Sequence, residues 1–202
     1  AAINEASPEI VHAHWAYEFA WAALDCGRPN VVTFHDAPRK ILRHMPNLYR
    51  LGRYCMARRT AREARFLTTV SPYMQEELQS WCGRTLELVP NPIAEEWFAS
   101  ARPIESRDLN RPKIAMVING WTSLKNPEPA LRAFAQVLAA VPAAELHLFG
   151  VDFGKNEYAN QWCRTRGLDQ HVTFHGRMTY EQLRLHLAQM TLLVHPSLEE
   201  SF

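Results

Sequence analysis

The chain has 202 residues, 47% hydrophobic and 21% charged, so it can bury one sizeable core or two smaller ones and is not a disordered segment. Its formal net charge of +1 gives no overall attraction to nucleic acid, and we expect no nucleic-acid partner. No run approaches the roughly 18 consecutive apolar residues of a membrane span, and the first residues lack a signal-peptide layout. Four dispersed cysteines form no CxxC or Cys/His metal spacing, which favours reduced thiols. We expect a cytoplasmic protein.

Short runs rich in β-forming residues recur along the chain, and turns followed by helical patterns separate them, which is the spacing of βα units rather than of hairpins. The runs are apolar nearly throughout instead of alternating, so we expect parallel sheets with both faces covered. The predicted strands are residues 10–14, 31–34, 66–70, 86–89, 114–118, 146–149, 172–174 and 192–195. The pattern predicts an α/β fold.

Helix starts are marked by capping residues. Ser71 and Asn126 each precede a proline, so we expect each to supply an N-cap oxygen with the proline at the first helical position. The sequence "TYEQ" at residues 179–182 is a capping box that opens a further helix through Ala188.

A charged stretch with two prolines and no apolar period, "ASARPIESRDLNRPK", interrupts the βα pattern. It predicts a linker at residues 99–111 between a first domain at residues 1–98 and a second at residues 112–202. In parallel sheets ligands bind outside the carboxyl ends of the strands, so the loops that follow the strands are the places where a site is expected.

The loop after the strand at 114–118 is the strongest candidate for an anion site. Gly120 lets the backbone turn closely, Lys125 brings a cation, and the helix that begins beyond Asn126 offers N–H groups and the positive end of its dipole. These features suit a phosphate. The plainer interpretation stays open, because glycine turns with a lysine are common and this is no Walker pattern.

Three further side chains follow strands. His35 directly follows "VVTF" and could hydrogen-bond a sugar or diphosphate, move a proton, or only fix its own loop. Glu199 and Glu200 follow the last strand, where a carboxylate can accept hydrogen bonds from sugar or ribose hydroxyls, or form a solvated turn.

The stretch from Arg39 to Arg65 is strongly basic, with Glu63 as its only acidic residue. We expect a helix that turns Leu51, Tyr54 and Cys55 toward the core. Such a helix could contact anionic lipid headgroups or an anionic lipid-linked acceptor, or be merely a solvated face. The arginines that could line its broad outer face are Arg50, Arg53, Arg58, Arg62 and Arg65.

The sequence contains no motif that is typical of a metal site or of a serine hydrolase. There is no Asp-x-Asp at a strand end and no cluster of His, Cys, Asp and Glu with metal spacing, so we expect no metal site and no cofactor. No GxSxG motif or Ser-His-Asp set supports a hydrolase.

Taken in order, eight segments resemble those of the GT-B glycosyltransferases of family 4, and the likeness covers nearly the whole chain. The segments are "VHAHWAY", "VVTFHD", "TTVSPYMQEEL", "LVPNPI", "G" with "KNP", "LHLFG", "VTFHGRMTYEQL" and "LLVHPSLEESF". The resemblance implies two Rossmann-like parallel-sheet domains, both incomplete here. It also implies a nucleotide-sugar donor held mainly by the second domain, and transfer with retention of configuration without an obligatory metal.

The resemblance also implies roles for particular residues. Lys125 matches the lysine that neutralises the donor diphosphate, while Trp121 stands where the family usually has an arginine. Glu200 matches the first glutamate of a pair that embraces the donor, and the second would fall beyond Phe202. The family's opening strand and glycine-rich loop have no counterpart before Ala1. We therefore expect an internal fragment, cut at both ends and inactive by itself.

Two other segments carry implied contacts. Gly176, Arg177 and Met178 correspond to the loop that contacts the base, and His35 aligns with a histidine placed near the transferred sugar and diphosphate. The resulting hypothesis is a retaining glycosyltransferase of polysaccharide or glycolipid assembly, acting on a carbohydrate or lipid-linked acceptor. The alternatives are an epimerase or phosphorylase of the same architecture, and a non-catalytic nucleotide-sugar-binding or membrane-docking module.

Overall fold

The computed structural model describes residues 2–99, 103 and 107–202, which form two compact units. The first contains the chain up to Pro92 together with Glu199–Phe202, and the second is Ile93–Leu198. The contacts thus place the boundary before the predicted linker at residues 99–111. Residues 100–102 and 104–106 of that linker lie outside the described part of the chain.

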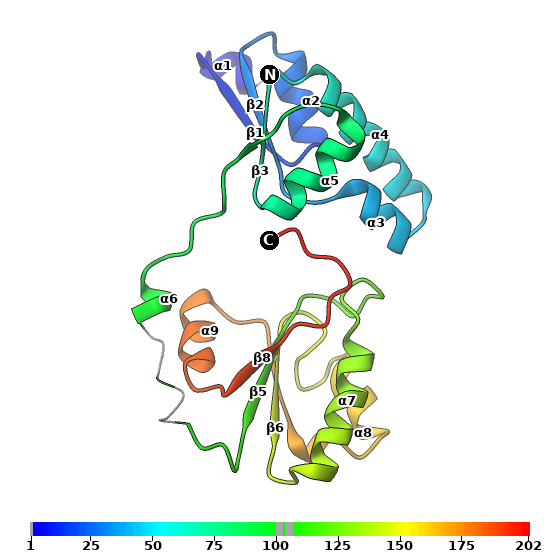
Figure 1. The fold of residues 1–202 in the computed structure, drawn as a ribbon, viewed down its shortest axis with the longest axis vertical. Helices are drawn as coiled ribbons and strands as arrows, with labels where there is room; N and C mark the ends of the chain where they lie inside the picture. Colours follow the sequence, from blue (N-terminus) through cyan, green and yellow to red (C-terminus); the bar gives the residue numbers. More distant parts are fainter. Residues whose placement is uncertain (1, 100–102, 104–106) are drawn as a thin grey trace. The chain divides into compact units, whose positions relative to one another are not determined.

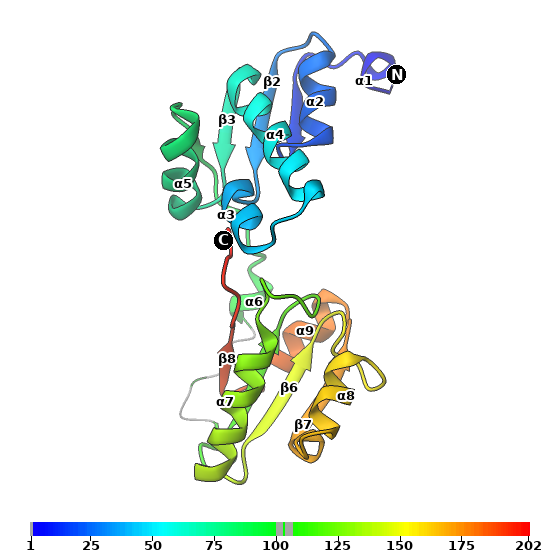
Figure 2. The same ribbon diagram turned by 90° about the vertical axis from the view of Figure 1, so that its right-hand side faces the viewer.

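The first unit is a four-stranded parallel sheet in the order β1-β2-β3-β4 (Figures 1 and 2). Its strands are β1 (Val11–His14), β2 (Asn30–Phe34), β3 (Phe66–Thr69) and β4 (Glu87–Leu88). Its helices are α1 (Ala2–Ala6), α2 (Glu18–Asp25), α3 (Pro38–His44), α4 (Leu48–Glu63) and α5 (Pro72–Cys82).

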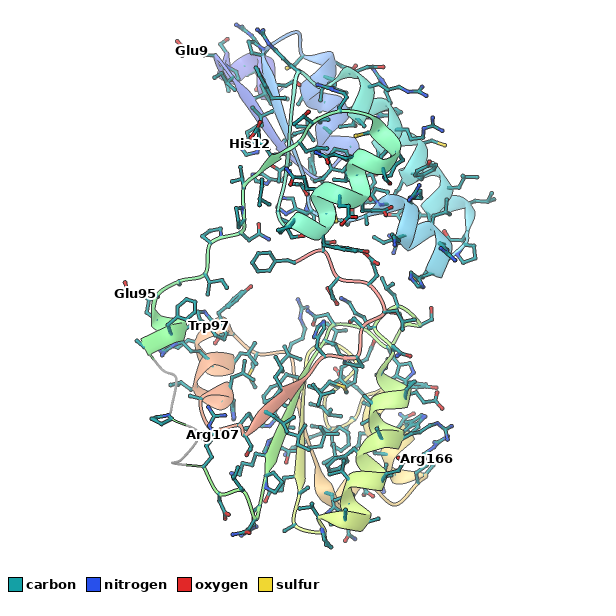
Figure 3. All side chains as sticks on the ribbon, in the orientation of Figure 1. Glu9, His12, Glu95, Trp97, Arg107 and Arg166 are labelled. Atoms are coloured by element: carbon teal, nitrogen blue, oxygen red, sulfur yellow. The ribbon has the colours of Figure 1, made fainter. Side chains whose placement is uncertain are left out.

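Helices α2, α4 and α5 pack against one face of this sheet and enclose the core of the first unit. Val32, Phe34 and Leu67 of the strands meet Ala57 and Ala61 of α4 there. The expectation that both faces are covered is not met by the described residues. His12, His14 and Phe66 lie on the opposite face and are exposed, and Figure 3 shows His12 directed away from these helices.

The second unit is also a four-stranded parallel sheet, in the order β7-β6-β5-β8. Its strands are β5 (Lys113–Val117), β6 (Glu145–Phe149), β7 (Val172–Gly176) and β8 (Leu192–Val194). Helices α7 (Pro127–Ala140) and α8 (Tyr158–Arg164) cover one face, and α9 (Tyr180–Leu187) lies on the other (Figure 1). A short helix, α6 (Glu96–Ala99), and a 3-10 turn, η2 (Asp169–His171), complete the unit.

All eight predicted strands form, with ends that differ by a residue or two from the predicted ones. Two predicted caps are also confirmed: Ser71 accepts a hydrogen bond from the Met74 N–H, and Thr179 and Gln182 form the complete capping box. Among the described residues, no helix is long and apolar enough to cross a membrane.

Asn126 is the N-cap residue and Pro127 opens the helix, as predicted, but the prediction that the Asn126 side chain supplies a capping oxygen is wrong. A capping side chain needs an extended backbone to reach back to the helix, but Asn126 is left-handed (φ 51°, ψ 44°) and makes no capping hydrogen bond. Asparagine tolerates this conformation better than most residues. Its Nδ2 instead donates to the Pro196 carbonyl oxygen at 3.2 Å, which ties the start of α7 to the segment after β8.

The predicted inner face of the basic helix is wrong as well. Leu51 and Cys55 are exposed on α4, and the buried positions are Ala57, Thr60 and Ala61. Small residues at these positions allow α4 to pack closely, and the Thr60 hydroxyl donates to the Ala16 carbonyl oxygen at 2.9 Å.

Candidate functional site

A pocket of about 330 Å³ lies in the second unit, where β5, β6 and β7 end. It contains the predicted Gly176, Arg177 and Met178 and residues from the other two strands and from α9. Its lining residues are Val117, Asn119, Phe149, Gly150, Gly176, Arg177, Met178, Tyr180 and Leu183. The pocket therefore occupies the position that is typical of ligand sites in parallel sheets.

Two glycines shape the floor of this pocket. Gly150 has φ +121°, and a Cβ at this residue would lie 1.9 Å from the Ile118 carbonyl oxygen, so no other residue fits. Gly176 has φ +69°. Its carbonyl oxygen accepts a hydrogen bond from the Gly150 N–H at 2.9 Å, and its own N–H donates to Phe153 at 3.1 Å. These hydrogen bonds fix the ends of β6 and β7 relative to each other.

A histidine stacks on Phe149, an aromatic residue that lines the pocket. The His175 ring lies 4.4 Å from the Phe149 ring, with an angle of 6° between the planes, and hydrogen-bonds His147 at 3.0 Å. Burial, together with the charges of His186 and His147, lowers the pKa of His175 to about 4. His175 is therefore uncharged at neutral pH and supports the floor as a neutral ring.

The loop that carries Gly120, Lys125 and Asn126 is held at the same edge of the sheet. The Gly120 N–H donates to the Val151 carbonyl oxygen at 3.1 Å, and the Lys125 N–H donates to the Thr122 hydroxyl at 3.2 Å. The Leu198 N–H donates to the Leu124 carbonyl oxygen at 2.8 Å, which joins the segment after β8 to this loop. These hydrogen bonds fix the backbone that presents Lys125.

The start of α7 is a weaker anion site than its sequence suggested. Pro127 and Pro129 lack an N–H, so only Glu128 and Ala130 among the first four helical residues have one to donate. Glu128 also brings a negative charge, which pairs with Arg132 at 2.7 Å. A phosphate at this position would depend more on Lys125 than on the helix.

Trp121, at a position where the resemblance implies an arginine, belongs to an aromatic cluster. Its ring packs 4.8 Å from Tyr158 and 6.0 Å from Phe153, and its backbone N–H donates to Asp152 at 2.8 Å. The residue therefore has a packing role and supplies no cation.

The remaining predicted residues belong to the first unit. His35 follows β2, and its Nε2 lies 2.8 Å from Nδ1 of His14. Burial, followed by the charges of His14 and His12, lowers its pKa. His35 is thus linked to the neighbouring strand rather than to its own loop.

Glu199 is held by α5. The Tyr73 hydroxyl donates to its two carboxylate oxygens at 2.7 and 2.8 Å, and the Ser71 hydroxyl donates to the Ser201 carbonyl oxygen at 2.6 Å. Glu199 and Glu200 are therefore grouped with the first unit, whereas the Lys125 loop and the Gly176–Met178 loop share the second.

Sequence reasoning missed several residues of the pocket. Asn119, Gly150 and Tyr180 lie in loops that the strand-end rule selects, but they were not singled out there. Tyr180 belongs to a capping box, which we interpreted only as a helix start. Over residues 2–99, 103 and 107–202, no group of three or more His, Cys, Asp or Glu side chains could hold a metal ion.

Two family models together cover almost the whole chain. Residues 1–97 match Glycosyltransferase Family 4, and residues 101–202 match Glycosyl transferases group 1. The chain belongs to the group 1 glycosyl transferases. A search of the curated proteins finds no match.

Solved structures share the fold of this group 1 glycosyl transferase. A sucrose-phosphate synthase from Thermosynechococcus elongatus superimposes with a TM-score of 0.76 at 17% identity, over 100% of this chain and 53% of the other. WaaG, a glycosyltransferase involved in lipopolysaccharide biosynthesis, gives 0.72 at 14% identity, over 99% and 56%. The catalytic domain of starch synthase IV from Arabidopsis thaliana, bound to ADP and acarbose, gives 0.65 at 13% identity, over 99% and 54%.

These likenesses confirm the predicted GT-B fold with two parallel-sheet α/β domains. The group 1 glycosyl transferase chain spans little more than half the length of the solved structures that it resembles.

Proposed function

We propose that this group 1 glycosyl transferase contributes the donor site of a retaining enzyme, which moves a sugar from a nucleoside-diphosphate sugar to an acceptor hydroxyl. The observation that carries the proposal is the pocket at Gly176–Met178, which lies at the same sheet edge as the Lys125 loop. A nucleoside would occupy the pocket and its diphosphate would face Lys125. The acceptor is a carbohydrate or a lipid-linked sugar in polysaccharide or glycolipid assembly.

In this proposal the leaving diphosphate is stabilised by charge. Negative charge grows on the diphosphate as the bond to the sugar breaks. A cation that is already in place lowers the activation barrier of this step, because no group of the protein has to move to stabilise the charge. Lys125 provides that cation, so the proposal needs no metal or cofactor. His35 and Glu200 are assigned to the transferred sugar, and no residue is assigned a covalent nucleophilic role.

Calorimetry tests the donor site directly. Titrating the chain with UDP, ADP and GDP should show binding to at least one of them, and Lys125→Ala should weaken it about tenfold or more, because a charge-assisted contact is lost. The matched control is Lys113→Ala at the opposite end of β5. Binding that is absent, or equally strong in Lys125→Ala, would contradict the proposal.

Acceptor dependence separates transfer from the alternative reactions. An epimerase changes its nucleotide sugar without an acceptor, and a phosphorylase requires inorganic phosphate. A fold neighbour titled as a putative UDP-N-acetylglucosamine 2-epimerase, with a TM-score of 0.60 at 14% identity, makes this comparison necessary. The assay is made on a protein that has the full length of these relatives, because this chain is expected to be inactive by itself. There, sugar release that requires an acceptor hydroxyl supports a transferase, whereas nucleotide binding without turnover supports a binding module.

We also propose that α3 and α4 contact the cytoplasmic face of an anionic membrane. Leu48 is 86% exposed and Tyr49 60% exposed at the start of α4, and Arg43 in the last turn of α3 is also exposed. Exposed apolar side chains beside cations are typical of interfacial helices. Not all of the basic residues are available for contact with lipid headgroups, since Arg39 pairs with Glu77 at 3.1 Å.

Vesicle co-sedimentation tests this contact. Vesicles with phosphatidylserine should bind the chain more than phosphatidylcholine vesicles do, and binding should fall between about 0.1 M and about 1 M salt, where screening shortens from about 10 to about 3 Å. Arg43→Glu should weaken binding, while Arg164→Glu on α8 should not. Binding that ignores lipid charge would contradict the contact.

A further inference from the structure

The pocket at Gly176–Met178 includes an exposed aromatic residue that was not among the residues predicted for it. Tyr180 lines this pocket and is 81% exposed, although it belongs to a well-defined helix. The capping box fixes its position, because the Thr179 N–H donates to Gln182 at 3.0 Å and the Gln182 N–H donates back at 3.3 Å. The ring is therefore presented to solvent from a rigid turn.

A second aromatic residue supports this ring. Trp97 of α6 packs against Tyr180 with ring centroids 5.9 Å apart and an interplanar angle of 88°. The Arg184 guanidinium, one turn further along α9, donates to the Glu96 carbonyl oxygen at 3.5 Å, which attaches α6 to α9. Figure 3 shows Trp97 on α6 beside α9. Because an edge-to-face pair occupies at most one face of each ring, Tyr180 keeps a face open.

The chemistry of the pocket fits a planar ring with a polar edge. Val117, Phe149 and Leu183 give it an apolar floor, Arg177 adds a cation at the rim, and the glycine backbone lets a ligand approach closely. Nucleobases combine a π-face with hydrogen-bonding edges, and aromatic side chains stack on them with little dependence on the base.

We propose that Tyr180, held by Trp97, is the residue on which the base of a nucleoside diphosphate stacks. The inference rests on the proposed function. It adds the residue through which the base, rather than the diphosphate, contributes to the binding affinity. Because Trp97 packs against Tyr180, we also expect the fluorescence of Trp97 to change when a ligand occupies the pocket.

Calorimetry with two probes separates the base from the phosphates. Tyr180→Ala should weaken binding of the preferred nucleoside diphosphate about tenfold or more and leave inorganic pyrophosphate binding unchanged, because only the former has a ring to stack. Tyr180→Phe should bind like the natural chain, since stacking needs the ring and not the hydroxyl. Tyr180→Leu should resemble Tyr180→Ala although it keeps an apolar side chain, and Leu185→Ala is the control on the same helix.

Fluorescence gives an independent readout. Adding the nucleoside diphosphate should change tryptophan emission in the natural chain, and Trp97→Phe should abolish most of that change. Equal loss of nucleotide and pyrophosphate binding in Tyr180→Ala would overturn the inference. So would a natural chain that binds both probes equally well, although the proposed function would survive. A natural chain that binds neither probe would refute the proposed function itself, and the inference with it.

Discussion

Removing one hydroxyl group, in Tyr17→Phe, tests the buried polar cluster that follows β2. Tyr17 is 2% exposed and Asp36 is 8% exposed, and the Tyr17 hydroxyl donates to both carboxylate oxygens at 2.8 Å. Arg53 lies over the Tyr17 ring, 3.5 Å from its centroid. Burial raises the pKa of Asp36, and the hydrogen bond from Tyr17 and the Arg53 charge oppose that rise.

The expected cost at neutral pH is about 1.5–3 kcal/mol, the usual worth of a hydrogen bond to a charged group. The pKa of Asp36 should rise further in the variant, because the hydrogen bond that lowers it is gone. A carboxyl whose pKa is higher in the folded than in the unfolded state binds more protons when folded, so stability falls as pH rises through that window. The cost of Tyr17→Phe should therefore be larger near neutral pH than in acid.

Amide hydrogen exchange of β2 measures the opening free energy of the first unit without treating the whole chain as one cooperative transition. Tyr54→Phe on α4 is the matched control, since the described residues offer its hydroxyl no hydrogen bond and its ring packs on Trp81. A loss below about 0.5 kcal/mol, typical of surface substitutions, would refute the argument. A loss that does not change with pH would show that Asp36 is not charged in the fold.

Three further substitutions test the second unit by urea denaturation. Gly150→Ala should cost more than about 2 kcal/mol, because its Cβ meets backbone. Gly167→Ala in the same unit, at φ +68° with open space, should cost about 1–2 kcal/mol, and equal costs would exclude the clash. His175→Gln should flatten the pH dependence of stability. The natural chain should lose stability as pH falls from about 6.5 to about 4, since the unfolded state binds the proton more tightly, and an unchanged profile in the variant would exclude His175 as the cause. Thr179→Ala should cost about 0.5–2 kcal/mol through loss of the cap, and no loss would contradict the capping role.

The strands could be predicted because their pattern is local. A buried parallel strand is apolar along its whole length, so residues 146–149 identify β6 without knowledge of its neighbours. The capping box at Thr179 is local too. The conformation of Asn126 is not, because its side chain bonds to the Pro196 carbonyl 70 residues away. The inner face of α4 was predicted wrongly for the same reason, because it depends on tertiary packing. Arg53 of α4, which was expected on the outer face, lies over the ring of Tyr17.

The candidate site was predicted only in part. Loops with glycine and lysine at strand ends could be recognised from the sequence. In the structure Gly176–Met178 line one pocket together with residues from the ends of β5 and β6. Tyr180 and Trp97 are 83 residues apart, and no sequence pattern joins them, so their contact had to come from the fold. The roles of His35, Lys125 and Glu200 in sugar transfer stay predictions.

The hydrogen bonds between Gly150, Gly176 and Phe153 have a consequence for ligand binding. A floor whose peptide groups already hydrogen-bond one another loses little conformational entropy when a ligand settles on it. Differences in affinity between ligands with and without a base then arise from the ring of Tyr180 and the side chain of Arg177. Relatives with the same floor could thus hold the base more or less tightly through changes in those two side chains alone.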